Sequence, residues 1–471
     1  MDKVIEFLDA NEKKWVERLS QNVAIASISC SPDNRPQTIE QMHVADKMLK
    51  ELGCSTEIVD LGSHTMHDGK SHPLPPVILA KLGDDPNKKT LLIYGHLDVQ
   101  PALRSDGWDT DPFVLTEKDG KMYGRGSTDD KGPVLGWVNV IESFQKTNTE
   151  IPINIKFCLE GMEESGSVGL EELVRKRDDF FKTNVDWVCI SDNYFLGKTK
   201  PCVTYGLRGC MYFYLEVICA KQDLHSGVFG GSVHEATVEL SHIFSSLVDV
   251  KGKILIDGVG KEVDDLTEEE MKTYADIDFD MGAYQADVGT NKLTEESKAK
   301  LLMRRWREPS LSIHGIQGAF AEPGEKTVIP GKVIGKFSIR LVPSMSFDHV
   351  EKCVKDHIEA VHAKLGTGNQ VKCYLAKGPG KPWKAETTTP NYQAAIKAVE
   401  DVWGVKPDLT REGCSIPITL VFEEVTGRSV LLLPMGSSDD GAHSQNEKLN
   451  KINYTNGMKV FANYIHRLGK E

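Results

Sequence analysis

The sequence lacks the features of a membrane-spanning, secreted or nucleic-acid-binding protein. No apolar run approaches the about 20 residues that a helix needs to cross a bilayer. The first residues, MDKVIEFLDANEKKWVERL, form an amphipathic helix pattern without the basic start and apolar run of a secretory signal. The net charge of −13 leaves no surplus of Lys and Arg for binding phosphates. We therefore expect a cytoplasmic protein with no membrane and no nucleic-acid partner.

Paired cysteines are missing as well. The ten Cys residues are scattered singly, with no CxxC pair. Several lie inside apolar runs, such as Cys158 in INIKFCLE and Cys189 in DWVCISD. This pattern is typical of buried, reduced thiols in a cytosolic protein. The chain also has no exact GxSxG and no HExxH, so serine-hydrolase and zincin hypotheses have no support.

The length of 471 residues is too great for one ordinary core and favours two domains. In the N-terminal part, helix-like segments alternate with short apolar runs, which predicts a largely parallel sheet covered by helices on both faces. From Leu207 onward the pattern is a long alternating strand followed by helices and strands, as in a smaller α+β domain. We predict a discontinuous α/β domain of residues 1–207 and 381–471, with a domain of residues 208–380 inserted between its parts.

Potential metal ligands follow the apolar runs of the larger domain. Four runs lead into a His or an acidic residue: LLIYGHLD at His96 and Asp98, INIKFCLEGMEE at Glu163 and Glu164, DWVCISD at Asp192, and LLLPMGSSDDGAH at His443. Asp129 lies in a glycine-bounded loop, GRGSTDDKG, that runs into a helix. In open α/β sheets, ligands bind beyond the carboxyl ends of the strands. We therefore expect these side chains to converge on one edge of the sheet.

Two imidazoles and several carboxylates suit Zn²⁺, Mn²⁺ or Co²⁺. A pair of such ions about 3.5–4 Å apart needs a carboxylate between them, and Asp129 is the natural bridge. Asp98 is placed to accept the second N–H of His96. Because Glu163 and Glu164 are adjacent, their side chains would diverge on an extended chain. One could then bind metal while the other serves as a general base.

Each of these pieces has an ordinary explanation when taken alone. A Glu–Glu pair is usually a solvated turn, a DDKG loop is usually an Asx turn, and His443 could be a core histidine. The four apolar runs that lead into ligands and the Asp129 loop would rarely occur together by chance. Their combination favours a two-metal hydrolase. A catalytically silent binding or scaffold protein of the same fold is the alternative from another class. The presence of every ligand together with Glu163 argues against it.

These segments resemble the M20 family of metallopeptidases, and the resemblance covers essentially the whole chain. The matching segments are YGHLDVQPA, GRGSTDDKGPVLGW, CLEGMEESGSVGL, ISDNYFLG, KQDLHSGVFGG, HGIQGAF, TVIPGKVIGKFSIRLVP, DLTREGCSIPITL and GSSDDGAHSQNEKL. The resemblance implies an α/β fold: a three-layer α/β/α catalytic domain with a zinc-exopeptidase-like mixed sheet. It also implies an inserted, smaller α+β domain, ferredoxin-like, that acts as a lid and in dimerisation.

The resemblance further implies two divalent metal ions per subunit, Mn²⁺ or Zn²⁺. One ion would be held by His96 and Asp192, the other by Glu164 and His443, and Asp129 would bridge them. Glu163 would be the general base for a water between the ions, and Asp98 would support His96. The peptide bond after Asp129 is expected to be cis.

By the same resemblance, the substrates are dipeptides such as Cys-Gly, hydrolysed with broad specificity. Thr327, Arg340 and Ser415, together with His443, would contact the peptide. A guanidinium such as that of Arg340 suits its terminal carboxylate. The protein would be a homodimer in which His225 of the partner subunit stabilises the oxyanion.

Two departures from the family pattern bear on specificity. The glycine segment in YLAKGPGKPW lacks the histidine expected before Lys381, and Cys414 stands where a glycine is expected. The preferred dipeptide and the choice between Mn²⁺ and Zn²⁺ stay open. An N-acyl-amino-acid hydrolase of the same fold is the alternative among hydrolases.

Overall fold

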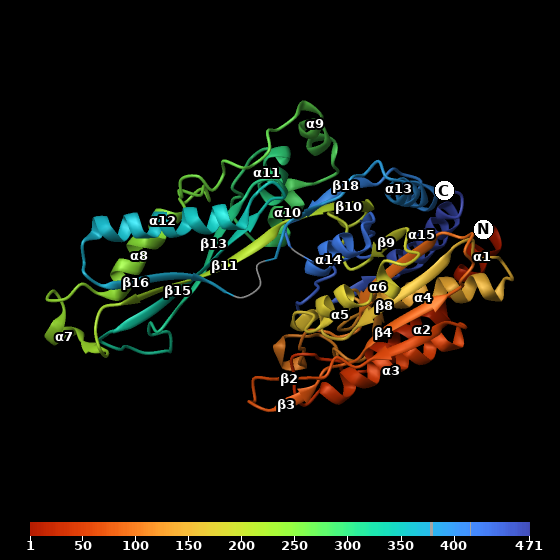
Figure 1. Ribbon diagram of the computed structural model, residues 1–471, viewed down its shortest axis with the longest axis horizontal. Coiled ribbons are helices and arrows are strands. Elements are labelled where there is room, and N and C mark those ends of the chain that lie inside the picture. The colour runs from red at the N-terminus through yellow and green to blue at the C-terminus, as the bar shows by residue number, and fades with distance from the viewer. Residues whose placement is uncertain (377–379, 415) are drawn as a thin grey trace. The chain divides into compact units, whose positions relative to one another are not determined.

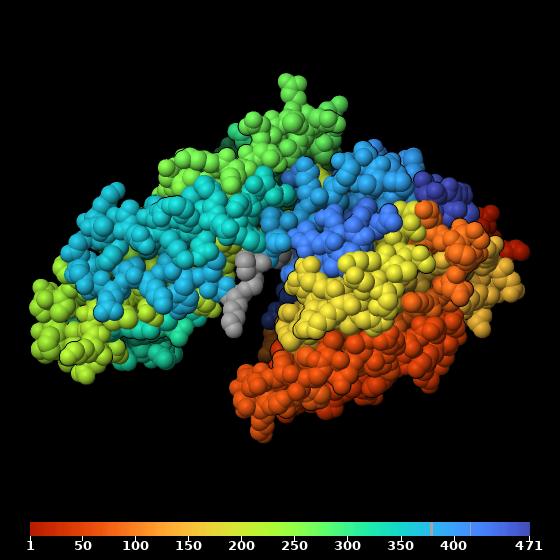
Figure 2. All heavy atoms as spheres, in the orientation of Figure 1, coloured from red at the N-terminus to blue at the C-terminus, as the bar shows by residue number. Residues whose placement is uncertain are grey.

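The computed structural model describes residues 1–376, 380–414 and 416–471. The chain forms two compact units. Unit 1 comprises Met1–Tyr205, Ala385–Thr410 and Ile418–Glu471, and unit 2 comprises Gly206–Lys384 and Arg411–Pro417. Unit 1 is thus built from both ends of the chain, coloured red to yellow and blue (Figures 1 and 2). Across the described residues, none of the helices combines the length and the apolar character needed to span a membrane.

The main sheet runs through unit 1 in the order β1-β4-β8-β5-β9-β19-β10. Its strands are β1 (Ser55–Val59), β4 (Val77–Leu82), β8 (Asn154–Glu160), β5 (Thr90–His96), β9 (Trp187–Ile190), β19 (Val430–Leu432) and β10 (Cys202–Leu207). Strands β8, β5, β9 and β19 are parallel, whereas β4, β1 and β10 pair antiparallel with their neighbours. The sheet is therefore mixed. Two further strands, β17 (Trp383–Lys384) and β18 (Asp408–Glu412), pair with β10.

Helices cover both faces of this sheet, as two adjacent residues of β5 demonstrate. Successive side chains of a strand point to opposite faces. The Tyr94 ring packs edge-on against Phe422, with ring centroids 5.4 Å apart, whereas Gly95 leaves room for Val134. Phe422 belongs to α14 (Pro417–Thr426) and Val134 to α4 (Lys131–Lys146). The layers are therefore α/β/α, which explains why β5 and β8 are buried along their whole length.

The other elements of unit 1 complete these layers. They are α1 (Asp2–Ala10), α2 (Glu12–Val23), α3 (Arg35–Glu51), α5 (Leu170–Lys176), α6 (Asp178–Phe181), α13 (Pro390–Trp403), α15 (Lys451–Leu468) and the short 3-10 turns η1 (Arg104–Asp106) and η2 (Glu163–Ser165). Small antiparallel sheets are formed by β2 (Ser63–Thr65) with β3 (Ser71–Pro73), and by β6 (Thr116–Lys118), β7 (Lys121–Tyr123) and β20 (Lys448–Asn450).

Unit 2 is built on an antiparallel sheet in the order β13-β15-β11-β16. Along the chain its elements are β11 (Gly209–Ile218), α8 (Ala236–Leu247), β13 (Ser310–Gln317), β15 (Lys332–Leu341), α12 (Phe347–Leu365) and β16 (Gln370–Leu375). This β-α-β-β-α-β order is that of ferredoxin-like folds. Alternate residues of β11 are buried, and they pack with residues of α8 and α12 in one apolar core. Figure 1 shows these two helices along the sheet.

The remaining elements of unit 2 are short. They are β12 (Leu224–His225), α7 (Ser226–Phe229), α9 (Glu268–Asp276), α10 (Met281–Val288), α11 (Lys298–Trp306) and β14 (Val328–Ile329). Helix α9 begins where the sequence has capping-box spacing, because the Thr267 side chain accepts the backbone N–H of Glu270 at 3.1 Å.

The stack of Trp137 on Phe461 joins α4 to the C-terminal helix α15. The rings lie 3.9 Å apart with an interplanar angle of 2°, and both are buried. We expect Phe461→Ala to destabilise the protein by about 3–5 kcal/mol, as is usual for removing a buried aromatic ring. Ile452→Ala is the matched control on the same helix, because Ile452 is 58% exposed. Thermal and urea unfolding would measure both, and equal effects would contradict the assignment of this core.

Candidate metal centre

The parallel strands of unit 1 bring the predicted ligands to one edge of the sheet. His96 is the last residue of β5, and Asp192 lies two residues beyond the end of β9. Glu164 lies in the turn after β8, and His443 in the loop after β19. Asp129 immediately precedes the N-cap of α4. Since β8, β5, β9 and β19 run in the same direction, the loops that follow them meet at their shared carboxyl end.

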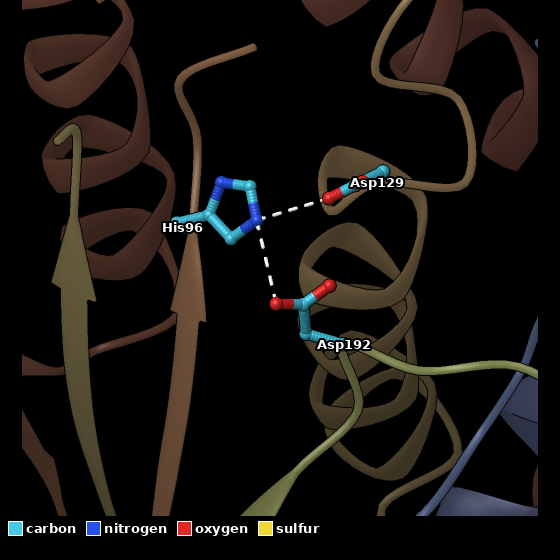
Figure 3. A group of neighbouring side chains, drawn as sticks. All are labelled: His96, Asp129 and Asp192. Atoms are coloured by element: carbon cyan, nitrogen blue, oxygen red, sulfur yellow. Dashed lines mark hydrogen bonds and ion pairs between the residues drawn. The ribbon is translucent and has the colours of Figure 1, made fainter. Parts of the chain in front are cut away.

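His96, Asp129 and Asp192 form the first ligand group (Figure 3). The imidazole Nε2 of His96 lies 3.1 Å from Oδ1 of Asp129 and 3.6 Å from Oδ2 of Asp192. One ligand atom from each residue lies within 4.8 Å of the others. The His96 side chain is fully buried, so this group forms inside the protein rather than on its surface.

Asp129, Glu164 and His443 form the second ligand group. The Nε2 of His443 lies 3.1 Å from Oδ2 of Asp129 and 3.0 Å from Oε2 of Glu164. Asp129 thus presents one carboxylate oxygen to each group. The predicted cis peptide bond between Asp129 and Asp130 is confirmed.

Asp98 organises both the first histidine and the glutamate turn. The Nδ1 of His96 lies 3.1 Å from the carbonyl oxygen of Asp98 and 3.4 Å from its carboxylate. A proton held there leaves Nε2 free to accept, as a metal ligand must. The two carboxylate oxygens of Asp98 accept the backbone N–H groups of Glu163 and Glu164, each at 3.1 Å.

The sequence prediction that Glu163 and Glu164 continue a strand is wrong. Strand β8 ends at Glu160, and both glutamates lie in the turn η2. The turn forms because Asp98 accepts two successive N–H groups, which a strand would use in its ladder. The two side chains still separate: Glu164 joins the second ligand group, and neither group includes Glu163.

The charged groups shift one another's pKa values. Burial raises the pKa of Glu163 well above its ordinary value. Burial lowers the pKa of His96, but hydrogen bonds to Asp129 and Asp192 outweigh it, so this pKa lies well above the ordinary value. Hydrogen bonds that His443 donates to Asp129 and Glu164 raise its pKa to about 10.

The donor set fits divalent cations. Each group offers one imidazole nitrogen and two carboxylates, which suit Zn²⁺ or Mn²⁺. Carboxylates buried this close together repel one another, and burial raises the pKa of Asp192. Bound cations would offset that repulsion in both groups.

The remaining predicted residues belong to unit 2 or lie outside the described residues. His225 ends β12 and is exposed, and its Nδ1 accepts the N–H of Gly227. The carbonyl of Thr327 accepts the N–H of Ser226 at 3.2 Å, and Arg340 lies on β15. Their roles stay predictions. Ser415 and most of the altered glycine segment, residues 377–379, lie outside the described residues.

Two neighbours of the ligands were missed from the sequence. The Gln100 side chain donates to Oε2 of Glu164 at 2.8 Å, and Glu447 is buried against the backbone of Asp129. Gln100 lies two residues after Asp98, and Glu447 lies four residues after His443. This closeness to predicted site residues is the only sign in the sequence that either belongs to the site. A polar residue beside a ligand does not reveal in sequence which way its side chain points.

The comparisons with known proteins agree with this geometry. The model of Peptidase family M20/M25/M40 matches residues 92–467. The chain belongs to the M20 peptidase family. It is 50% identical over 467 residues to the Beta-Ala-His dipeptidase of Homo sapiens, covering 99% of this chain and 92% of that protein. It is 46% identical over 469 residues to the Cys-Gly metallodipeptidase dug1 of Schizosaccharomyces pombe, covering 99% and 98%.

A solved structure extends this likeness to the whole fold. The crystal structure of human carnosine dipeptidase 1 matches with a TM-score of 0.90 and 49% identity, covering 100% of this chain and 99% of that one. The predicted M20 resemblance and the mixed α/β fold are confirmed. The chain is a peptidase of a family whose members use divalent metals.

Divalent cations should stabilise the folded chain through these two groups. A free Mn²⁺ concentration 100 times the dissociation constant would add about 2.7 kcal/mol per site. We expect Mn²⁺ to raise the unfolding temperature of chelator-treated protein, and Asp192→Asn to reduce that rise. Asp186→Asn is the control, because Asp186 lies at the opposite end of β9 from the ligands. This variant should show the same rise in unfolding temperature as the parent protein. If neither Mn²⁺ nor Zn²⁺ changes the unfolding temperature of the chelator-treated protein, the site is contradicted.

Proposed function

We propose that the protein is a dipeptidase that works with two divalent ions, Mn²⁺ or Zn²⁺, in unit 1. His96 and Asp192 would hold one ion, Glu164 and His443 the other, and Asp129 both. The observation that carries this proposal is the position of the Asp129 carboxylate between the two ligand groups. One of its oxygens lies 3.1 Å from the His96 imidazole, and the other lies 3.1 Å from the His443 imidazole. A carboxylate shared in this way is what a two-ion site requires.

Two bound divalent ions would lower the pKa of a water towards neutrality and polarise the carbonyl of the scissile bond. Glu163 would accept the proton of the attacking water and return it to the leaving amine. Asp98 would keep both His96 and the Glu163 turn in place through the contacts described above.

The substrate class follows from the relatives and from the residues of unit 2. Two relatives are dipeptidases by name, for Beta-Ala-His and for Cys-Gly. We infer that this chain hydrolyses short peptides with a free amine and a free carboxylate, Cys-Gly among them, with broad specificity. Arg340 would bind the carboxylate through its guanidinium. Thr327, Ser415 and His443 would contact the rest of the peptide.

We further propose that unit 1 is the catalytic domain and unit 2 a lid that also mediates dimerisation. The predicted limits of the two domains are residues 1–207 with 381–471, and residues 208–380. In a cytoplasmic homodimer, His225 of the partner subunit would steady the oxyanion. This proposal is supported by the exposed segment after His225, in which Val228 and Phe229 are 68% and 41% exposed.

Glu163→Ala tests the general base most directly. Loss of the proton acceptor should lower kcat for Cys-Gly by about 10²–10⁴-fold. Both ions should remain bound, because Glu163 belongs to neither ligand group. Steady-state kinetics and metal analysis of the purified protein would measure the two effects.

The adjacent Glu164→Ala is the matched control, since it should lose metal as well as activity. A Glu163→Ala enzyme with turnover close to the parent would show that the base is misassigned. In the parent protein, hydrolysis of N-acetylglycine in preference to Cys-Gly would replace the dipeptidase proposal with an acyl-amino-acid hydrolase.

A further inference from the structure

Two loops of unit 1 supply the second ligand group together with the Glu164 turn. The Asp129 loop comprises residues 124–130, and the His443 loop comprises residues 437–448. The His443 side chain is 57% exposed, so little packing holds it in place. Its φ of +62° is a conformation that non-glycine residues seldom adopt. The spacing between His443 and Asp129 must therefore depend on how the two loops are joined.

Glu447 joins them through a carboxylate that accepts four hydrogen bonds. Its Oε2 accepts from the Arg125 guanidinium at 2.7 Å and from the Gly126 N–H at 3.0 Å. Its Oε1 accepts from the N–H groups of Thr128 and Asp129, at 3.1 and 3.2 Å. Its backbone carbonyl accepts the N–H of Gly124 at 2.9 Å. Glu447 is fully buried, so water cannot substitute for these contacts.

Asp440 makes a second connection and closes the His443 loop on itself. Its Oδ2 accepts the Thr128 hydroxyl at 2.8 Å and the Ser437 N–H at 2.9 Å. Its Oδ1 accepts the Lys448 ammonium at 2.5 Å, and its carbonyl accepts the Lys448 N–H at 2.8 Å. Asp440 and Lys448 are both buried. Hydrogen bonds from Ser437 and Lys448 to Asp440 therefore hold both ends of the His443 loop.

We propose that Glu447 is a positioning residue of the metal centre. Its carboxylate holds the backbone N–H of Asp129 against the base of the His443 loop, and so sets the distance between two ligands that lie far apart in the sequence. Glu447 touches neither substrate nor ion in this account. This inference rests on the proposed function, because it assigns Glu447 to the ion held by Glu164 and His443.

Glu447→Gln tests the proposal with little change in shape. In this variant an amide nitrogen replaces one of the two carboxylate oxygens. The nitrogen cannot accept from an N–H or a guanidinium, so the two hydrogen bonds to that position are lost. Calorimetric titration of the chelator-treated full chain with Mn²⁺ should show one ion bound about 10- to 100-fold more weakly, as when a residue that orients a ligand is removed. The other ion should be affected less. In metal-free protein, the amides of Thr128 and Asp129 should exchange hydrogen faster.

Glu142→Gln is the matched control. Glu142 is also a buried carboxylate, and it pairs with Arg18 at 2.6 Å and with Lys14, but it lies near the far end of α4. Its variant should bind both ions as the parent does. Glu447→Asp, which keeps the charge but shortens the side chain, gives the same comparison if Glu447→Gln does not fold.

The outcomes separate this proposal from the proposed function. Unchanged binding of both ions by Glu447→Gln would overturn it, and so would an equal loss of affinity in Glu142→Gln. A parent protein that binds neither Mn²⁺ nor Zn²⁺ would overturn the proposed function. In that case, faster exchange at Thr128 and Asp129 in Glu447→Gln would still support the connection between the loops, and unchanged exchange would overturn it.

Discussion

The carboxylate of Asp129 is the contact on which the rest of the site depends. Its two oxygens lie 3.1 Å from the imidazoles of His96 and His443, which are far apart in the sequence. Asp192 and Glu164 complete the two groups and bring further negative charge into a buried space. Such a cluster is unfavourable unless cations share it, because buried like charges repel. The fold has to hold these groups together against that repulsion.

The fold meets this constraint with strand direction and with buried polar contacts. His96 and the Glu164 turn lie at the same edge of the sheet because β5 and β8 are parallel neighbours. The spacing of these two strands therefore sets the distance between His96 and the turn. Asp98 then joins the two by contacting the His96 ring and accepting two N–H groups of the turn. The loops that carry Asp129 and His443 start from the pairing of β7 with β20, and the Glu447 side chain joins them beyond it.

The sequence predicts the ligands whose chemistry and position along the chain coincide. His96 and Asp192 follow apolar runs, and an acidic or imidazole side chain at a strand end has few other uses in a covered sheet. The turn at Glu163 could not be predicted, because it is produced by Asp98, which is distant in the sequence. Glu447 could not be predicted either, because its role depends on N–H groups over three hundred positions away. Such contacts are tertiary, and no local pattern encodes them.

The most direct measurement of the central claim is a crystal structure of the protein soaked in Mn²⁺, with the ions located by anomalous scattering. A two-ion site predicts two peaks about 3.5–4 Å apart, one on each oxygen of Asp129, with His96 beside the first and His443 beside the second. A single ion, or ions bound elsewhere while Asp129 contacts neither, would contradict it.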